Sequence, residues 1–67
     1  MFVDSQGTPL KIGDKVVVAK SELKYTSLKK QSGWIVIGFL EQETVTEVIV
    51  RQGREEIDFP LITVTRE

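Results

Sequence analysis

Apolar residues in this chain fall into short runs separated by polar turns, and the strongest run spans residues 33–40. Its residues are mostly β-branched or aromatic, which predicts a β-strand. Both faces of that strand are apolar, so we expect it to be central or strongly bent, with a bend or bulge at Gly38. The two faces are Ile35, Ile37 and Phe39 on one side, and Trp34, Val36 and Leu40 on the other.

Weaker runs of the same kind predict further strands before and after this one. In chain order they cover residues 2–3, 15–19, 44–51, 54–59 and 62–65. Pro60-Leu61 interrupts the last two, because proline cannot donate to a strand ladder, and a 3₁₀ turn is expected there. Short strands with turns every 8–12 residues or so are typical of a small β-barrel or sandwich.

The strands at 44–51 and 54–59 are expected to form a hairpin, in which Gly53 supplies the positive φ that a tight turn needs. Two registers are open to it. The favoured register sets Arg51 opposite Glu55 and Ile49 opposite Ile57, which matches charge with charge and apolar with apolar. The other register sets Arg51 opposite Arg54 and does neither.

The opening segment, residues 4–18, reads DSQGTPLKIGDKVVV and contains two turn signals. The first turn covers residues 4–7, and the second is Gly13-Asp14, where Gly13 is expected to adopt a positive φ. Leu10 and Ile12 are expected to enter the core just before the second turn. This segment therefore predicts a scaffold without catalytic chemistry.

A single domain over residues 1–67 is expected from the length, with a core made mainly of β-branched residues. Cysteine and histidine are both absent, which excludes disulfides and zinc sites of the Cys/His type, and no cofactor or metal is expected. The expected core residues are Val3, Leu10, Ile12, Val16, Val18, Trp34, Ile35, Val36, Ile37, Phe39, Val48, Ile49, Val50, Ile57, Phe59, Leu61 and Val64.

Residues 20–32, KSELKYTSLKKQS, form a long early loop with few strand-forming residues. A helical turn is expected to start at Ser21 or at Ser27, since serine is a good N-cap. One long early loop, a late tight hairpin and a proline turn before the last strand together predict an all-β fold. We expect a small SH3-like barrel of five to six short antiparallel strands.

The turn pattern of residues 4–18 can be written D-x-x-G-x-x-L-x-x-G-D-x-V-x-V. Its defined positions are Asp4, Gly7, Leu10, Gly13, Asp14, Val16 and Val18. The pattern resembles the SH3-like C-terminal domain of PhnA-type proteins, and more loosely the small SH3-like or KOW-like barrel proteins of bacteria and phages. The likeness continues loosely through Lys20, Leu23, Lys24 and residues 28–30 to Gly33, and fades after Leu40.

The resemblance implies an SH3-like barrel and leaves the activity open. PhnA-type proteins carry an N-terminal zinc ribbon that this chain lacks, so whatever the ribbon contributes is not carried over. A KOW motif places its second glycine much closer to the Gly13-Asp14 pair than Gly33 lies. That departure argues against a ribosomal or transcription-factor role.

Charge is unevenly distributed along the chain, although the net charge is only −1. Residues 1–40 carry +3 and residues 41–67 carry −4. Such asymmetry marks either an interaction surface or segments that mix in space, and both interpretations stay open. No run approaches the ~20 apolar residues of a membrane span, and no signal peptide is recognisable, so a cytoplasmic protein without membrane contact is expected.

Catalysis is not expected of this chain. General acid–base chemistry most often uses histidine, and there is none. Glu55 and Glu56 are adjacent strand residues that face opposite ways, and Glu41 and Glu43 belong to a solvated turn. A domain of this size also leaves little room for a pocket of ~300 Å³ or more. The chain is therefore expected not to be an enzyme.

A lysine-rich segment holds the candidate binding residues, which are Lys20, Lys24, Tyr25, Lys29, Lys30 and Trp34. Lysines neutralise phosphates and an exposed aromatic ring stacks on a base, so these residues are a candidate nucleic-acid surface. The alternative is that the lysines solubilise a loop while the two aromatic residues cover the end of the barrel. The acidic balance of the chain disfavours nucleic-acid binding.

Protein–protein contact is the function that we favour from the sequence. SH3-like barrels offer loop-lined grooves and strand edges to partners, and Tyr25, Trp34 and Pro60 are candidates to line such a groove beside Glu41 and Glu43. A small core also makes self-association useful. We therefore expect a non-enzymatic module that binds a protein partner or itself, with nucleic acid as the alternative.

Overall fold

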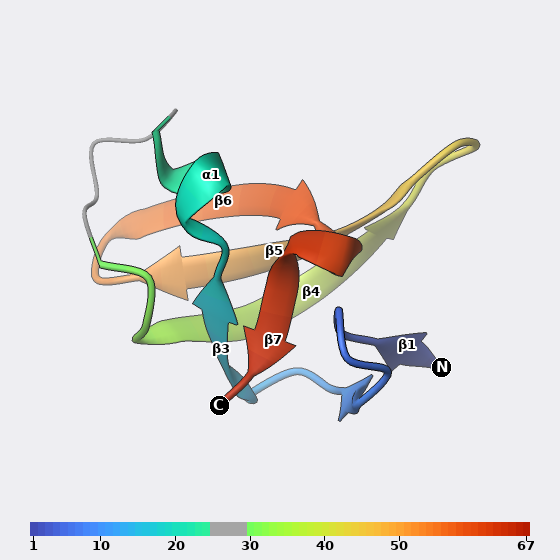
Figure 1. The fold of residues 1–67 in the computed structure, drawn as a ribbon, viewed down its shortest axis with the longest axis horizontal. Coiled ribbons are helices and arrows are strands. Elements are labelled where there is room, and N and C mark those ends of the chain that lie inside the picture. Colours follow the sequence, from blue (N-terminus) through green and yellow to red (C-terminus); the bar gives the residue numbers. More distant parts are fainter. Residues whose placement is uncertain (25–29) are drawn as a thin grey trace.

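The computed structural model describes residues 1–24 and 30–67, which form a mostly β domain with two antiparallel sheets (Figure 1). A ribbon pairs β1 (Phe2–Val3) with β2 (Pro9–Leu10), and a five-stranded sheet has the order β6-β5-β4-β3-β7. Its strands are β3 (Lys15–Val18), β4 (Trp34–Glu41), β5 (Thr46–Gln52), β6 (Glu55–Pro60) and β7 (Val64–Arg66). The expectation of short antiparallel strands is confirmed, but the described residues form seven of them rather than five or six, because Pro9–Leu10 also pairs as a strand.

Two short helices connect the strands. The 3₁₀ helix η1 (Leu61–Thr63) joins β6 to β7 and confirms the predicted turn after Pro60, whose carbonyl accepts the Thr63 hydroxyl at 2.7 Å. The helical turn α1 (Lys20–Leu23) follows β3 and begins one residue before the predicted Ser21. Ala19 occupies its N-cap without a side-chain hydrogen bond. The alternative start at Ser27 lies outside the described residues.

A β-bulge interrupts β4 at the predicted place. Val36 pairs with Val50 and Gly38 pairs with Ile49, so Ile37 is the extra residue. An inserted residue reverses the alternation of a strand beyond it. Trp34 and Val36 face the core before the bulge, Phe39 packs against the core after it, and Leu40 is exposed. The expectation that Leu40 shares a face with Trp34 is therefore wrong.

The core is a single apolar cluster whose residues come from the beginning, the middle and the end of the chain. Its two large rings, Trp34 and Phe59, meet edge to face at 5.6 Å between centroids. Leu23 of α1 joins the cluster although it was not among the expected core residues. The fully or largely buried members are Leu10, Val16, Val18, Leu23, Trp34, Val36, Val48, Val50, Phe59, Leu61 and Val64.

Five expected core residues lie outside this cluster. Ile35, Ile37 and Ile49 are half-buried and do not pack against it, and two others are exposed. Ile12 is 66% exposed because it belongs to the turn between β2 and β3, where the inward–outward alternation of a strand does not apply. That turn is closed by the Asp14 N–H on the Lys11 carbonyl at 3.1 Å, and Gly13 has a φ of +98° as predicted. Val3 is exposed at the end of β1.

The β5–β6 hairpin adopts neither predicted register. Gln52 pairs with Glu55 around a two-residue turn, Gly53-Arg54, in which only Gly53 has a positive φ, as in a type II′ turn. Arg51 is then opposite Glu56, so it still faces an acidic residue, one position after the predicted Glu55. This register is favoured because it sets the buried Val50 opposite Ile57 and the buried Val48 opposite Phe59.

Asp4 ties the start of the chain to its last strand. Its carboxylate is 5% exposed and accepts backbone N–H groups from Gln6 and Thr8, both at 2.8 Å, and from Arg66 at 2.7 Å. Ser5 adds its N–H to the Val64 carbonyl at 2.8 Å. Residues 4 and 5 therefore occupy the outer edge of β7, the side not paired with β3.

The ionisation of Asp4 follows from the same contacts. Burial raises the pKa of Asp4, but the three backbone N–H groups and the charge of Arg66 outweigh burial and leave the pKa below its ordinary value. The anionic carboxylate is thus the form that the fold selects.

Candidate functional site

The six candidate binding residues divide between buried, exposed and undescribed positions. Lys20 begins α1, Lys24 is the C-cap residue directly after it, and Lys30 lies before β4; all three are exposed. Tyr25 and Lys29 lie outside the residues that the structure describes. The described part of the segment therefore presents lysine side chains at the surface beside α1.

Trp34, one of the candidate binding residues, does not reach the surface of the described structure. Its side chain is fully buried, and its ring packs on Phe59. Its Nε1–H donates to the Lys30 carbonyl at 3.1 Å, which satisfies the one polar group of the indole. Trp34 thus holds the lysine-rich segment against the core, and a buried ring has no face to stack on a base.

Residues 30–33 are tied to the sheet by further hydrogen bonds. Gln31 pairs with Val18 through its backbone carbonyl and its side-chain amide, at 2.8 and 3.2 Å. Gln52 donates its amide to the Ser32 carbonyl at 2.7 Å and to the Lys30 carbonyl at 3.4 Å. The position of Lys30 is therefore set by β3 and β5 together.

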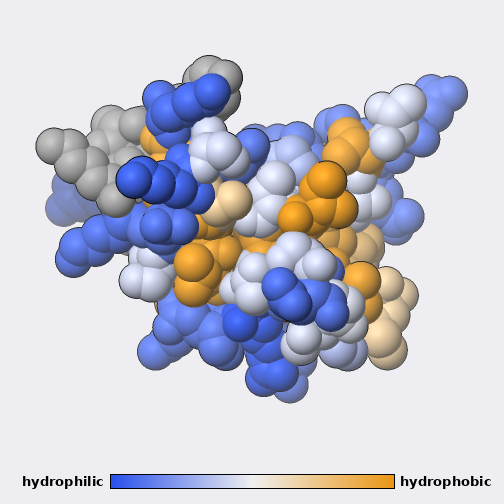
Figure 2. Space-filling model, viewed as in Figure 1, coloured by the Kyte–Doolittle hydropathy of each residue, from blue (hydrophilic) through white to orange (hydrophobic). Residues whose placement is uncertain are grey.

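An apolar surface runs over η1 and the base of the β4–β5 hairpin. Figure 2 shows orange patches on this face, beside the protruding hairpin, with white and blue residues between them. The exposed apolar side chains of these elements are Leu40, Val45 and Ile62, and Ile62 is 79% exposed. Glu41 and Glu43 in the hairpin tip are exposed as well.

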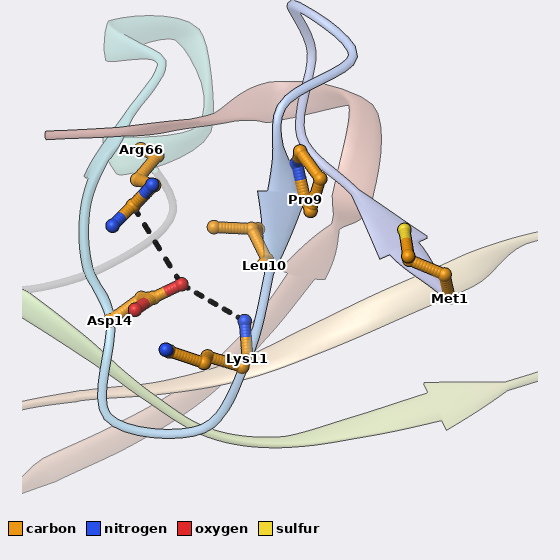
Figure 3. A pocket seen from close by; sticks show the side chains of 6 residues that line it. All are labelled: Met1, Pro9, Leu10, Lys11, Asp14 and Arg66. Carbon is orange, nitrogen blue, oxygen red and sulfur yellow. Dashed lines mark hydrogen bonds and ion pairs between the residues drawn. The ribbon is translucent and has the colours of Figure 1, made fainter.

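A pocket of about 310 Å³ lies at the other end of the scaffold, between β2, the β2–β3 turn and β7 (Figure 3). Its lining residues are Met1, Pro9, Leu10, Lys11, Asp14 and Arg66. The expectation that the domain has little room for a pocket of this size is wrong. The open end of the scaffold, where the β1–β2 ribbon meets the five-stranded sheet, provides the space.

Asp14 occupies the centre of this pocket's polar side. It accepts the Lys11 N–H at 3.0 Å, and its carboxylate lies 3.8 Å from Arg66 Nε (Figure 3). The Asp14 side chain is 9% exposed and that of Arg66 is 48% exposed. Sequence analysis recognised Asp14 as a turn residue but gave no reason to bring Arg66 to it from the far end of the chain.

A pair of carboxylates on the outer face of the β5–β6 hairpin was also missed. Glu47 is opposite Pro60, and Asp58 is opposite Ile49, two positions further along β5. The two acids are therefore diagonal neighbours on the same face. A hydrogen bond shared with Asp58 raises the pKa of Glu47, and burial adds to the rise. The correct hairpin register would have revealed this pair, whereas the predicted register did not.

Neither acid of this pair lines the pocket in Figure 3. Within residues 1–24 and 30–67 there is no group of three or more acidic residues placed to hold a metal ion. The described residues also contain no helix long and apolar enough to cross a membrane.

Comparisons with protein-family models, with curated proteins and with solved structures find no match to this chain. The candidate surfaces are therefore defined by the chain's own geometry: the exposed lysines beside α1, the apolar surface over η1 and the hairpin, and the pocket beside β7.

Proposed function

We propose that the protein is a non-enzymatic, SH3-like binding module that acts through protein–protein contact, with a partner protein or with a second copy. The observation that carries this proposal is the exposed apolar surface over η1 and the β4–β5 hairpin. Exposed apolar patches bordered by charge are typical of interaction surfaces.

The SH3-like part of the proposal is supported by the order of elements. A long connection separates β3 from β4, tight hairpins join β4 to β5 and β5 to β6, and a 3₁₀ turn leads into β7 beside β3. The turn pattern from Asp4 to Asp14 resembles that of PhnA-type proteins and supports the same assignment. A cytoplasmic location remains part of the proposal.

Protein contact is favoured over nucleic-acid binding because of Trp34. Its ring is buried and cannot stack on a base, so one of the two aromatic residues on which the nucleic-acid hypothesis depended does not support it. Lys20, Lys24 and Lys30 remain exposed, so phosphate contact is an outcome that the experiment must detect.

The test compares Ile62→Lys with a matched control, Ile12→Lys. Both isoleucines are exposed, but Ile12 lies in the β2–β3 turn and Ile62 lies in the apolar surface. Light scattering over a concentration series reports self-association, and parallel affinity capture reports partners. We expect Ile62→Lys to abolish association and Ile12→Lys to leave it unchanged.

Two results contradict the proposal. The first is a monomer at all concentrations whose captured proteins are the same for wild type and Ile62→Lys. The second is oligonucleotide binding in a gel-shift assay with a Kd near or below about 1 µM at physiological salt, which points to nucleic acid instead.

A further inference from the structure

We propose that the pocket beside β7 binds a carboxylate that carries a small apolar group. This site is separate from the apolar surface over η1, and it does not depend on the function proposed for that surface. It combines two exposed cationic side chains with an apolar wall in one concave site (Figure 3).

The cationic side is made by Arg66 and Lys11. Arg66 comes from β7 and half of its side chain is exposed, while Lys11 directly follows β2 and is exposed. The Arg66 Nε lies 3.8 Å from Asp14, which is too long for a strong hydrogen bond. Besides this long ion pair, the described residue whose charge interacts with Arg66 is Asp4, and no side-chain hydrogen bond occupies the guanidinium in the described part of the chain. Its fork of N–H donors can therefore still reach a carboxylate.

Asp14 sets the charge of the ligand. Its carboxylate is largely buried and already accepts the Lys11 N–H, so it is poorly placed to attract a cation from solvent. It also offsets one positive charge, but Lys11, Arg66 and the α-amino group of Met1 still leave an excess of positive charge around the pocket. This excess favours an anion, and the Asp14 carboxylate repels a phosphate dianion more strongly than a single carboxylate.

The apolar lining residues indicate that the ligand also carries an apolar group. Pro9, Leu10 and Met1 are the apolar lining residues: Leu10 is buried, whereas Pro9 and Met1 are exposed at the rim, and Figure 3 shows the Leu10 side chain directed toward Arg66 and Asp14. A volume of about 310 Å³ is at the small end of ligand sites, which suits a group the size of one or two amino-acid residues. The site therefore fits a short aliphatic acid or the C-terminal residue of a peptide.

The backbone around the pocket is held by hydrogen bonds that do not use the side chains of Arg66 and Lys11. Gly13 donates to the Val36 carbonyl at 2.8 Å, and Asp14 donates to the Lys11 carbonyl at 3.1 Å. The Arg66 N–H is held by Asp4 at 2.7 Å. Such a preformed site spends little binding energy on ordering itself, which helps a small ligand to bind.

The test is an NMR titration of the ¹⁵N-labelled full chain with N-acetyl-leucine. We expect saturable shifts at the amides of Leu10, Lys11 and Arg66, with a Kd of about 1–10 mM, as is usual for a ligand of this size. N-acetyl-leucinamide lacks the charge and is expected to bind at least about tenfold more weakly, because a hydrogen bond to a charged group is lost. Acetate lacks the apolar group and is expected to be weaker as well.

Variants assign the effect to the pocket. Arg66→Gln is expected to weaken N-acetyl-leucine at least about tenfold, and Lys11→Gln provides a second, independent removal of charge. Arg54→Gln is the matched control, because it makes the same change in the β5–β6 turn, away from the pocket. A tripeptide ending in leucine, with a free or an amidated C-terminus, tells a peptide ligand from a free acid by its relative affinity.

Three results would overturn the proposal. One is the absence of saturable shifts at these amides up to about 50 mM, well beyond the affinity range of such ligands. Another is equal binding of N-acetyl-leucine and its neutral amide. The third is inorganic phosphate binding more tightly than N-acetyl-leucine with the same shifts, which would replace the carboxylate by a phosphate group.

Discussion

Replacing Asp4 with alanine removes one carboxylate that accepts three backbone N–H groups. Each hydrogen bond to a charged group contributes about 1.5–3 kcal/mol. The N–H groups of Gln6 and Thr8 belong to the local turn, where water can replace the carboxylate, whereas that of Arg66 joins the outer edge of β7 to the start of the chain. Counting one full bond and partial loss of two, we expect Asp4→Ala to cost about 2–4 kcal/mol.

That loss is large for a domain of this size. At roughly 0.05–0.15 kcal/mol per residue, a chain of 67 residues has a total stability of about 3–10 kcal/mol. Urea unfolding followed by Trp34 fluorescence measures the change, since the ring is fully buried in the folded state. With a slope of about 1 kcal/mol per molar urea, the midpoint should fall by about 2–4 M.

Two further variants make the measurement decisive. Asp4→Asn keeps one acceptor oxygen, so a smaller loss is expected and the protein stays measurable if the alanine variant unfolds. Glu41→Gln changes an exposed carboxylate in the hairpin tip and should shift stability by less than about 0.5 kcal/mol. If Asp4→Ala costs no more than Glu41→Gln, the role assigned to the Asp4 carboxylate is wrong.

Three other predictions follow from particular contacts. Because folding lowers the pKa of Asp4, the unfolded chain takes up a proton at a higher pH than the folded protein does. The stability difference between wild type and Asp4→Asn should therefore be complete above about pH 4 and shrink as the pH falls through the folded-state pKa of Asp4. Urea titrations at a series of pH values measure this difference. Asp58→Asn should lower the pKa of Glu47, seen by NMR, and stabilise the fold by about 0.3 kcal/mol at pH 7 by removing a like-charge neighbour; an unchanged Glu47 pKa would contradict this. Trp34→Phe should cost about 1–2 kcal/mol in thermal unfolding by circular dichroism, because the Lys30 carbonyl loses its donor and the core loses volume, whereas full retention of stability would show that this tether contributes nothing.

The strands and turns were predictable because they depend on local sequence. Gly13 marked the turn correctly, since its positive φ favours glycine, and Gly38 marked the bulge although its backbone conformation does not itself require glycine. The β5–β6 register was not predictable from the Arg51–Glu55 match alone. A one-residue slip keeps Arg51 opposite an acid, Glu56, and the choice depends on which valines the rest of the core buries.

The candidate site was less predictable, because it depends on contacts between distant parts of the chain. An aromatic residue in an apolar strand, Trp34, has the same sequence signal whether it is exposed or buried, and only packing against Phe59 decides. The pocket needs Arg66 beside Asp14, which follows from the pairing of β7 with β3. No local pattern predicts that pairing.

The bond between Asp4 and Arg66 also has a consequence for the order in which the protein assembles. Its two residues are 62 positions apart, so it closes almost the whole chain into one loop, at a high cost in chain entropy. During synthesis Asp4 leaves the ribosome early, but its hydrogen-bond donor in β7 is among the last residues to be made. The domain therefore completes its folding only after translation of β7, and a ribosome paused earlier holds a chain whose sheet still lacks that edge.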